Sequence, residues 1–164
     1  MKIVSSMCTL LLITQIGVTS FGQSGISNLM RKYKNDSNVA SLKYEGDFMK
    51  KYMSDNEDIK TTLEYIDIMT FSKNYDISND DKLGIKTILK KEQFEELMNA
   101  KSQEGTIKIY ALTSQNLIKS LFASFKSDGS IYYVLMKGNI HLDEIAKIGS
   151  KLNISQLDFL KKVK

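Results

Sequence analysis

The chain has no proline and no tryptophan, and it has one cysteine and one histidine among its 164 residues. A structural zinc site needs four cysteine or histidine ligands, which Cys8 and His141 cannot supply. No serine lies in a G-x-S-x-G motif, so a serine hydrolase would depend on His141 as its base. His141 stands at the predicted start of a helix, and we interpret it as a surface residue there and not as a catalytic base. We therefore predict no metal site and no catalytic residue.

The N-terminus has the three parts of a secretory signal peptide. Lys2 supplies a positive charge, Met7–Ile13 is a short apolar run, and Ser20-Phe21-Gly22 places small residues before a cut. The run is shorter than the about 20 residues of a membrane-spanning helix. We predict that residues 1–22 are a signal peptide and that the mature chain, 23–164, has no transmembrane segment. A buried N-terminal helix is the alternative interpretation.

Export removes Cys8, so the mature chain is free of cysteine and its stability cannot depend on disulfides. Cys8 lies at the front of the apolar run, whereas the lipid-bearing cysteine of a lipoprotein follows that run. We therefore do not expect a lipid anchor at Cys8. Lysine and arginine total 23 against 19 acidic residues, a formal net charge of +4, and basic and acidic residues are interleaved along the sequence without a basic block. Because nucleic-acid binding needs a clustered basic surface, we exclude that class of partner. No repeat or linker divides residues 23–164, which we predict to form one domain.

Hydrophobic periodicity predicts an α+β fold. The longest apolar strands flank a tight Ser127-Asp128-Gly129 turn, and an amphipathic helix, Leu142–Leu152, follows them. The spacing of Ile59 and Leu63 suggests a helical turn, but 56–65 is left open between helix and loop. Further helices are expected at Gly25–Lys34, from Asp47 onward, and from about Leu83 to Lys101; further strands are expected at Val39–Tyr44, Ile66–Phe71 and Thr106–Leu112.

This order predicts one mainly antiparallel five-stranded sheet with two βα crossovers and a C-terminal β-meander, packed with helices. Both faces of the long hairpin are apolar: Leu121 and Phe125 share one face and Phe122 lies on the other. In an antiparallel sheet, this pattern indicates either helices on both sides or one face buried by a partner.

Two further groups of residues are candidate ligand sites, a calcium-binding loop and a phosphate-binding loop, and neither fits the required pattern. Asp76-x-Ser78-x-Asp80-Asp81 resembles a calcium-binding loop, but Asp81 replaces the turn glycine and Thr87 replaces the bidentate glutamate. We interpret it as a solvated loop. The glycines are too far apart for a phosphate-binding loop, so no cofactor is predicted.

Adjacent aromatic residues in the second hairpin strand suggest an interaction surface. Neighbours on a strand face opposite ways, so at least one of Tyr132 and Tyr133 could be presented on an exposed face. We predict a possible interaction surface formed by Phe122, Tyr132, Tyr133 and Met136. The alternative is that each tyrosine packs under a helix with its hydroxyl at the edge.

Two motifs resemble a known family. They are Phe94-Glu95-Glu96-Leu97-Met98, on the predicted long helix, and Lys137-Gly138-Asn139-Ile140-His141-Leu142-Asp143-Glu144-Ile145-Ala146-Lys147. The chain resembles the small exported proteins of Bacteroidetes grouped as domain of unknown function 4252. The resemblance implies a Bacteroidetes origin, export and a part in envelope regulation, and it carries over no catalytic residue. His141 departs from the family pattern, which usually has aspartate there.

These observations favour an exported, non-enzymatic binding or regulatory domain of the cell envelope. It would bind a protein partner, or a second copy of itself, through a sheet face. The alternative is a small periplasmic carrier of an apolar or aromatic ligand, which predicts a closed apolar cavity of several hundred Å³ between sheet and helices. A hydrolase that uses His141 is the third and least favoured hypothesis.

Overall fold

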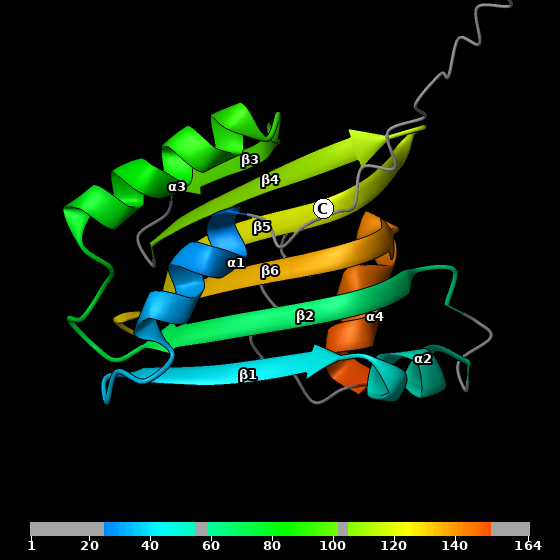
Figure 1. Ribbon diagram of the computed structural model, residues 1–164, viewed down its shortest axis with the longest axis horizontal. Coiled ribbons are helices and arrows are strands. Elements are labelled where there is room, and N and C mark those ends of the chain that lie inside the picture. Colours follow the sequence, from blue (N-terminus) through cyan, green and yellow to red (C-terminus); the bar gives the residue numbers. More distant parts are fainter. Residues whose placement is uncertain (1–24, 55–58, 102–104, 152–164) are drawn as a thin grey trace, which may run out of the picture.

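A six-stranded antiparallel sheet organises the protein, shown as a computed structural model in Figure 1. The structure describes residues 25–54, 59–101 and 105–151. The predicted signal peptide and its cleavage site lie outside these ranges. The elements are α1 (Gly25–Met30) with a 3-10 turn at Arg31–Tyr33, β1 (Val39–Glu45), α2 (Asp47–Ser54), β2 (Thr62–Phe71), α3 (Asn79–Lys91), β3 (Glu95–Lys101), β4 (Thr106–Ser114), β5 (Leu117–Ser127), β6 (Ser130–Ile140) and α4 (Leu142–Lys151).

The strand order is β1-β2-β6-β5-β4-β3, and every neighbouring pair is antiparallel. The β5–β6 hairpin confirms the predicted turn: Asp128 and Gly129 both have positive φ, as a two-residue hairpin loop requires. β6 then lies between β5 and β2, at the centre of the sheet. Gly138 of β6 lies opposite a bulge in β2, where the two backbones approach closely.

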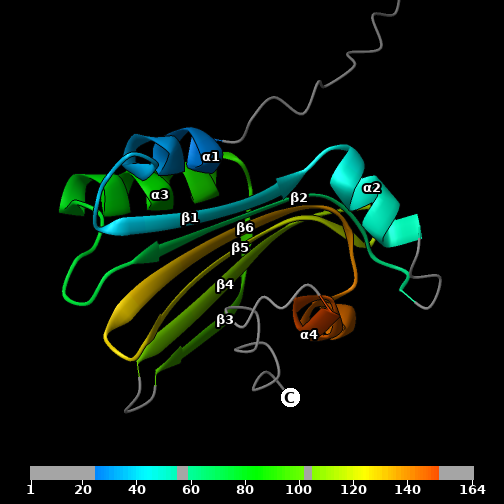
Figure 2. The ribbon, with the colours of Figure 1, turned by 90° about the horizontal axis from the view of Figure 1, so that it is seen from below.

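Helices lie on both faces of the sheet, which is one of the two arrangements that the apolar hairpin predicted. Figure 2 shows α1 and α3 on one face and α4 on the other, with α2 at the end of β1 and β2. None of the described helices is long and apolar enough to cross a membrane.

Each face has its own buried core. The α3-side core lies under α1 and α3, and the α4-side core is completed by α2 and α4. The α3-side core consists of Ile26, Leu29, Met30, Met69, Phe71, Ile77, Ile85, Leu89, Phe122, Tyr133 and Leu135; the α4-side core consists of Met49, Ile59, Leu63, Ile66, Ile68, Ile109, Leu121, Ala123, Phe125, Val134, Met136, Ile140, Ile145 and Ile148.

The predicted count of five strands is wrong, because the sequence from Glu95 to Lys101 forms β3 and does not continue α3. The helix ends at Lys91, and Gln93 takes a left-handed conformation with φ 60°. Glutamate, leucine, methionine and lysine all favour helices, which explains the error. β3 is an edge strand that pairs only with β4, and most of its side chains are exposed. Pairing with β4 therefore overrides the local helix propensity.

The predicted pair of crossovers is also only partly right. α2 joins β1 to its antiparallel neighbour β2, so this connection does not cross the sheet. Only α3 carries the chain across, from β2 to β3 at the opposite edge (Figure 1). The helical spacing of Ile59 and Leu63 was misleading as well, because β2 already begins at Thr62. Leu63 is buried between exposed neighbours there, which is the alternation of a strand.

Candidate functional site

A pocket of about 350 Å³ lies between α3 and the sheet face formed by β4, β5 and β6. Its helix wall is one face of α3, because its lining positions follow the spacing i, i+3, i+4 and i+7. Its sheet wall comes mostly from alternate residues of the strands, which share one face; Phe125, which belongs to the α4-side core, is the exception. The lining residues are Lys82, Ile85, Lys86 and Leu89 from α3, Thr106, Lys108 and Tyr110 from β4, Phe122, Ser124, Phe125 and Lys126 from β5, and Ile131 and Tyr133 from β6.

The floor of the pocket is aromatic. Tyr110, Phe122 and Tyr133 come from three neighbouring strands, and their rings follow one another across the sheet. The ring centroids of Tyr110 and Phe122 are 6.4 Å apart, and those of Phe122 and Tyr133 are 6.1 Å apart. Both pairs are stacked, so the rings form a continuous aromatic row beneath the pocket. Burial and the neighbouring Glu96 carboxylate raise the pKa of Tyr110 to about 12, so its hydroxyl stays protonated at neutral pH.

Four lysines also line the pocket: Lys82 and Lys86 from α3, Lys108 from β4 and Lys126 from β5. Lys82 has a partner, since its Nζ lies 2.6 Å from Oδ2 of Asp76. Within the described ranges, no ion pair involves the other three lysines. The pocket therefore combines an apolar floor with an excess of positive charge.

Asp76 fixes one side of the pocket. Its Oδ1 accepts hydrogen bonds from the Tyr133 hydroxyl at 2.9 Å and from the Ile77 backbone N–H at 2.7 Å, while Oδ2 binds Lys82. Burial, followed by the Asp76 charge, raises the pKa of Tyr133 well above its ordinary value. These contacts orient the Tyr133 ring and neutralise one lysine.

The structure separates the four residues of the predicted interaction surface. Phe122 and Tyr133 belong to the α3-side core and line the pocket, whereas Met136 belongs to the α4-side core and is fully buried. Tyr132 is half-buried against that second core, where its ring stacks on Phe125 at 4.7 Å. The four residues thus do not meet on one exposed surface, but two of them, Phe122 and Tyr133, form part of the pocket floor.

His141 lies on the other side of the sheet from the pocket, at the start of α4. Its backbone N–H donates to Thr61 Oγ1 at 2.9 Å, and its carbonyl accepts from the Glu144 N–H at 3.1 Å. The Glu144 carboxylate accepts the backbone N–H groups of Lys60 and Thr61. Partial burial would raise the pKa of Glu144, but these hydrogen bonds outweigh it and hold the pKa below its ordinary value. The arrangement joins α4 to the start of β2, and it gives the hydrolase hypothesis no support.

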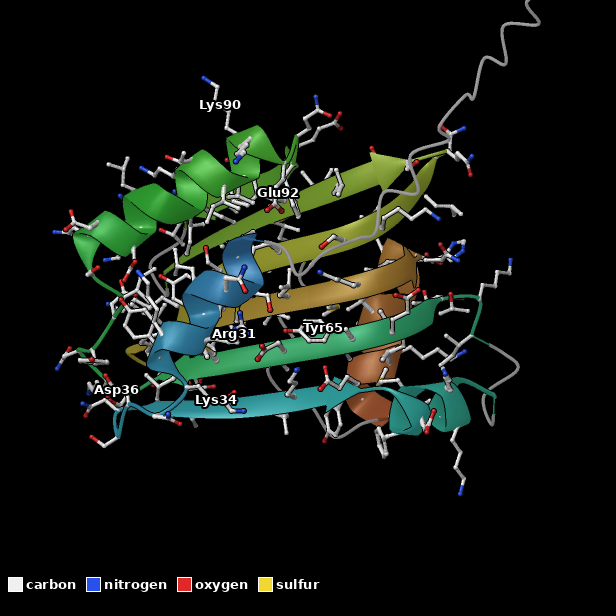
Figure 3. All side chains as sticks on the ribbon, viewed as in Figure 1. Arg31, Lys34, Asp36, Tyr65, Lys90 and Glu92 are labelled. Atoms are coloured by element: carbon white, nitrogen blue, oxygen red, sulfur yellow. The ribbon has the colours of Figure 1, made fainter. Side chains whose placement is uncertain are left out.

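Asp67 of β2 is a buried carboxylate under α1, with only 5% of its surface exposed. The Tyr65 hydroxyl donates to Asp67 Oδ2 at 2.8 Å and lies 3.2 Å from Ser27 Oγ of α1. In Figure 3, Tyr65 lies on β2, beside α1. Among the described residues, Asp67 Oδ1 has no hydrogen-bond partner. Burial raises the pKa of Asp67, and the Tyr65 hydrogen bond and the Lys43 charge only partly oppose this.

This burial predicts a pH dependence of stability. A carboxyl whose folded pKa is raised stabilises the fold only while it is protonated, so its effect is lost as pH rises from the unfolded pKa through the folded one. We expect Asp67→Asn to gain stability relative to the native protein as pH rises above the ordinary pKa of aspartate, measured by urea unfolding. Asp36→Asn is the control of opposite sign, because hydrogen bonds from Tyr75 and Asn38 lower the pKa of Asp36. Equal slopes for the two variants would contradict this assignment.

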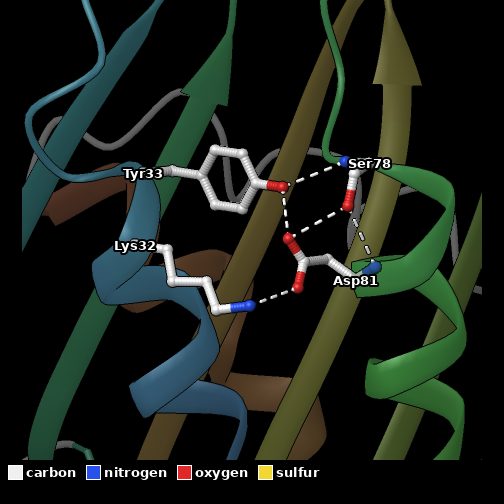
Figure 4. A network of polar contacts seen from close by, with 4 residues as sticks. All are labelled: Lys32, Tyr33, Ser78 and Asp81. Carbon is white, nitrogen blue, oxygen red and sulfur yellow. Dashed lines mark hydrogen bonds and ion pairs between the residues drawn. The ribbon is translucent and has the colours of Figure 1, made fainter.

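The loop that resembles a calcium site is engaged in other contacts (Figure 4). Asp81 accepts hydrogen bonds from Lys32 Nζ and from the Tyr33 hydroxyl, both at 2.6 Å. Ser78 caps α3, since its Oγ accepts the Asp81 N–H at 3.1 Å. In the part of the chain that the structure describes, no group of three potential metal ligands occurs. Through these hydrogen bonds, the loop and the start of α3 are held against the 3-10 turn that follows α1.

Sequence reasoning missed the pocket lysines. A local signal exists, because Thr106, Lys108 and Tyr110 alternate on β4, and Lys82 and Lys86 are one helical turn apart on α3. Each signal alone describes an ordinary solvated surface. Only the crossover of α3 places its lysines above those of β4 and β5.

Comparison with known proteins identifies the family. A family model described as Domain of unknown function (DUF4252) matches residues 33–148. This range includes both motifs that carried the resemblance, although the first lies on β3 and not on a helix. The searches of curated proteins and of solved structures found no match. The resemblance is therefore confirmed at the level of the family, and the Bacteroidetes origin stays a prediction.

Proposed function

We propose a binding function for this chain, which belongs to the family described as Domain of unknown function (DUF4252). In this proposal it is an exported, non-enzymatic domain of the cell envelope, and its pocket between α3 and the sheet binds a small ligand with an apolar or aromatic body. The observation that carries the proposal is the stacked floor of Tyr110, Phe122 and Tyr133.

The lining of the pocket favours binding over catalysis. Among the described residues that form it, none is a histidine, a carboxylate or a thiol. General acid–base or nucleophilic catalysis ordinarily uses such groups. Lysine and tyrosine are present, but the Asp76 carboxylate is shared between the Tyr133 hydroxyl and the Lys82 ammonium, which makes it a structural contact.

Its size and shape suit a small ligand. Ligand pockets in proteins range from about 300 to 1,000 Å³ and are mostly apolar with a few placed polar groups. A pocket of about 350 Å³ is at the lower end of this range, and Thr106 and Ser124 add hydroxyls to its wall. The carrier hypothesis predicted a closed apolar cavity, whereas the lysines make this one partly polar.

The export part of the proposal is supported by the sequence pattern of residues 1–22. N-terminal sequencing of the mature protein checks it, with Gln23 as the expected first residue. Binding to a protein partner or to a second copy, through a sheet face, stays a prediction of the sequence.

The test of ligand binding uses the neutral fluorescent probe N-phenyl-naphthylamine. We expect it to bind with a Kd of roughly ten to a hundred micromolar, with enhanced fluorescence, because its two-part ring system fits an aromatic floor. Ser124→Phe places a ring in the pocket beside the Tyr133 position and should weaken binding at least about tenfold.

Ser114→Phe is the matched control, because Ser114 is exposed at the end of β4 and does not line the pocket. It should bind the probe like the native protein. If the probe does not bind, or if both variants bind it equally well, the pocket is not a ligand site and the proposed function fails.

A further inference from the structure

We infer that the ligand of this pocket is a small organic anion, whose apolar body lies on the ring floor and whose anionic group meets Lys86, Lys108 and Lys126. This inference rests on the proposed function and specifies the chemical class of the ligand. Its basis is the juxtaposition of stacked rings with three lysines that have no ion pair among the described residues.

The sheet wall changes from aromatic to basic along the strands. Tyr110 of β4 lies opposite Phe122 of β5, and the next pair on this face toward the hairpin turn is Lys108 and Ser124. Lys126 follows Ser124 on the same face of β5, since residues two apart on a strand share a face. A ligand that lies along the strands would therefore meet rings at one end and ammonium groups at the other.

The helix wall repeats this order. Leu89 and Ile85 of α3 are buried and face the floor, while Lys86 is exposed at the rim. Lys82 is already held by Asp76 at 2.6 Å, so it contributes little net charge. Of the lysines with which α3 lines the pocket, only Lys86 therefore has no ion pair among the described residues. Lys86 lies on the wall opposite to Lys108 and Lys126.

Three like charges around one small cavity repel each other, and an anion between them relieves this repulsion. A carboxylate, sulfonate or phosphate would also accept charge-assisted hydrogen bonds from the ammonium groups. The volume of about 350 Å³ limits the body to one or two rings or a short acyl chain. An uncharged apolar ligand would use the floor and leave the lysines unpaired.

The experiment compares two probes that differ by one anionic group: anilinonaphthalene sulfonate, and N-phenyl-naphthylamine, which lacks the sulfonate. We expect the native protein to bind the sulfonate at least about tenfold more tightly, because it adds charge-assisted contacts to the same ring contacts. Rising salt should weaken sulfonate binding and leave binding of the neutral probe nearly unchanged.

The double variant Lys108→Met and Lys126→Met should reduce the affinity ratio of the two probes to near one. The matched control is Lys90→Met with Lys91→Met, which removes the same charge from exposed positions outside the pocket. In Figure 3, Lys90 extends from α3 away from the strands. This control should keep the native ratio.

The outcomes separate the two proposals. Equal affinities for the two probes in the native protein, or an unchanged ratio in the pocket double variant, would overturn the anion inference. If Ser124→Phe still weakened binding of the neutral probe at least about tenfold, the proposed ligand site would stand. Failure of both probes to bind would overturn both proposals.

Discussion

Gly138→Ala should destabilise the protein by more than about 3 kcal/mol, enough to remove much of the stability of an ordinary domain. Gly138 has φ +143°, a backbone conformation that side chains rarely adopt. A Cβ atom at this position would lie 2.0 Å from the Thr62 carbonyl oxygen and 3.0 Å from Leu63 Cα. Because both contacts are with backbone, no side-chain rotation can relieve them.

The expected result is a large decrease in the urea concentration at the unfolding midpoint, or loss of the folded protein. Circular dichroism measures both. Gly46→Ala is the control, since Gly46 also has a positive φ of 69° but nothing within 4 Å of an added Cβ. It should cost only the left-handed backbone penalty of about 1–2 kcal/mol. Similar losses for the two variants would show that β2 and β6 do not approach so closely.

Phe122→Ala is the second large effect, with an expected loss of about 3–5 kcal/mol. The Phe122 side chain is 1% exposed and lies between the rings of Tyr110 and Tyr133 on the central strands. Its removal leaves a cavity at the centre of the α3-side core, and the surrounding strands cannot close it without losing register. Urea unfolding measures the loss.

Phe48→Ala removes the same atoms from α2, where the ring is 52% exposed and stacks on Tyr44 at 5.1 Å. This control should cost about 1 kcal/mol, the contribution of an exposed aromatic pair. The assignment of Phe122 to the core would be wrong if the two variants lost equal stability.

Local signals in the sequence predict most of the fold. Asp128-Gly129 closes the hairpin as predicted, because a two-residue turn depends on neighbouring residues alone. The helix expected from about Leu83 exists as α3, but it begins earlier, at Asn79, where Ser78 caps it. β3 was missed because its residues favour helix locally and become a strand only by pairing with β4. Strand pairing between distant segments has no such local signature.

The candidate site was predicted only in part for the same reason. Phe122 and Tyr133 were predicted as part of an interaction surface, but their partners in the pocket lie on α3 and β4. Lys86 and Lys108 look like ordinary surface residues in their own segments. Whether these two lysines line the same pocket depends on where α3 crosses the sheet, which the sequence pattern does not specify.

The central place of β6 has a consequence for how the chain folds. Among the described strands, β6 is synthesised last, yet it pairs with both β2 and β5, the inner strands of the two halves of the sheet. Thr62 pairs with Asn139, far along the chain, and contacts of such long range slow folding. While a nascent chain still ends before β6, β1–β2 and β3–β5 have no strand to join them. Completion of the sheet must therefore wait until β6 has been synthesised.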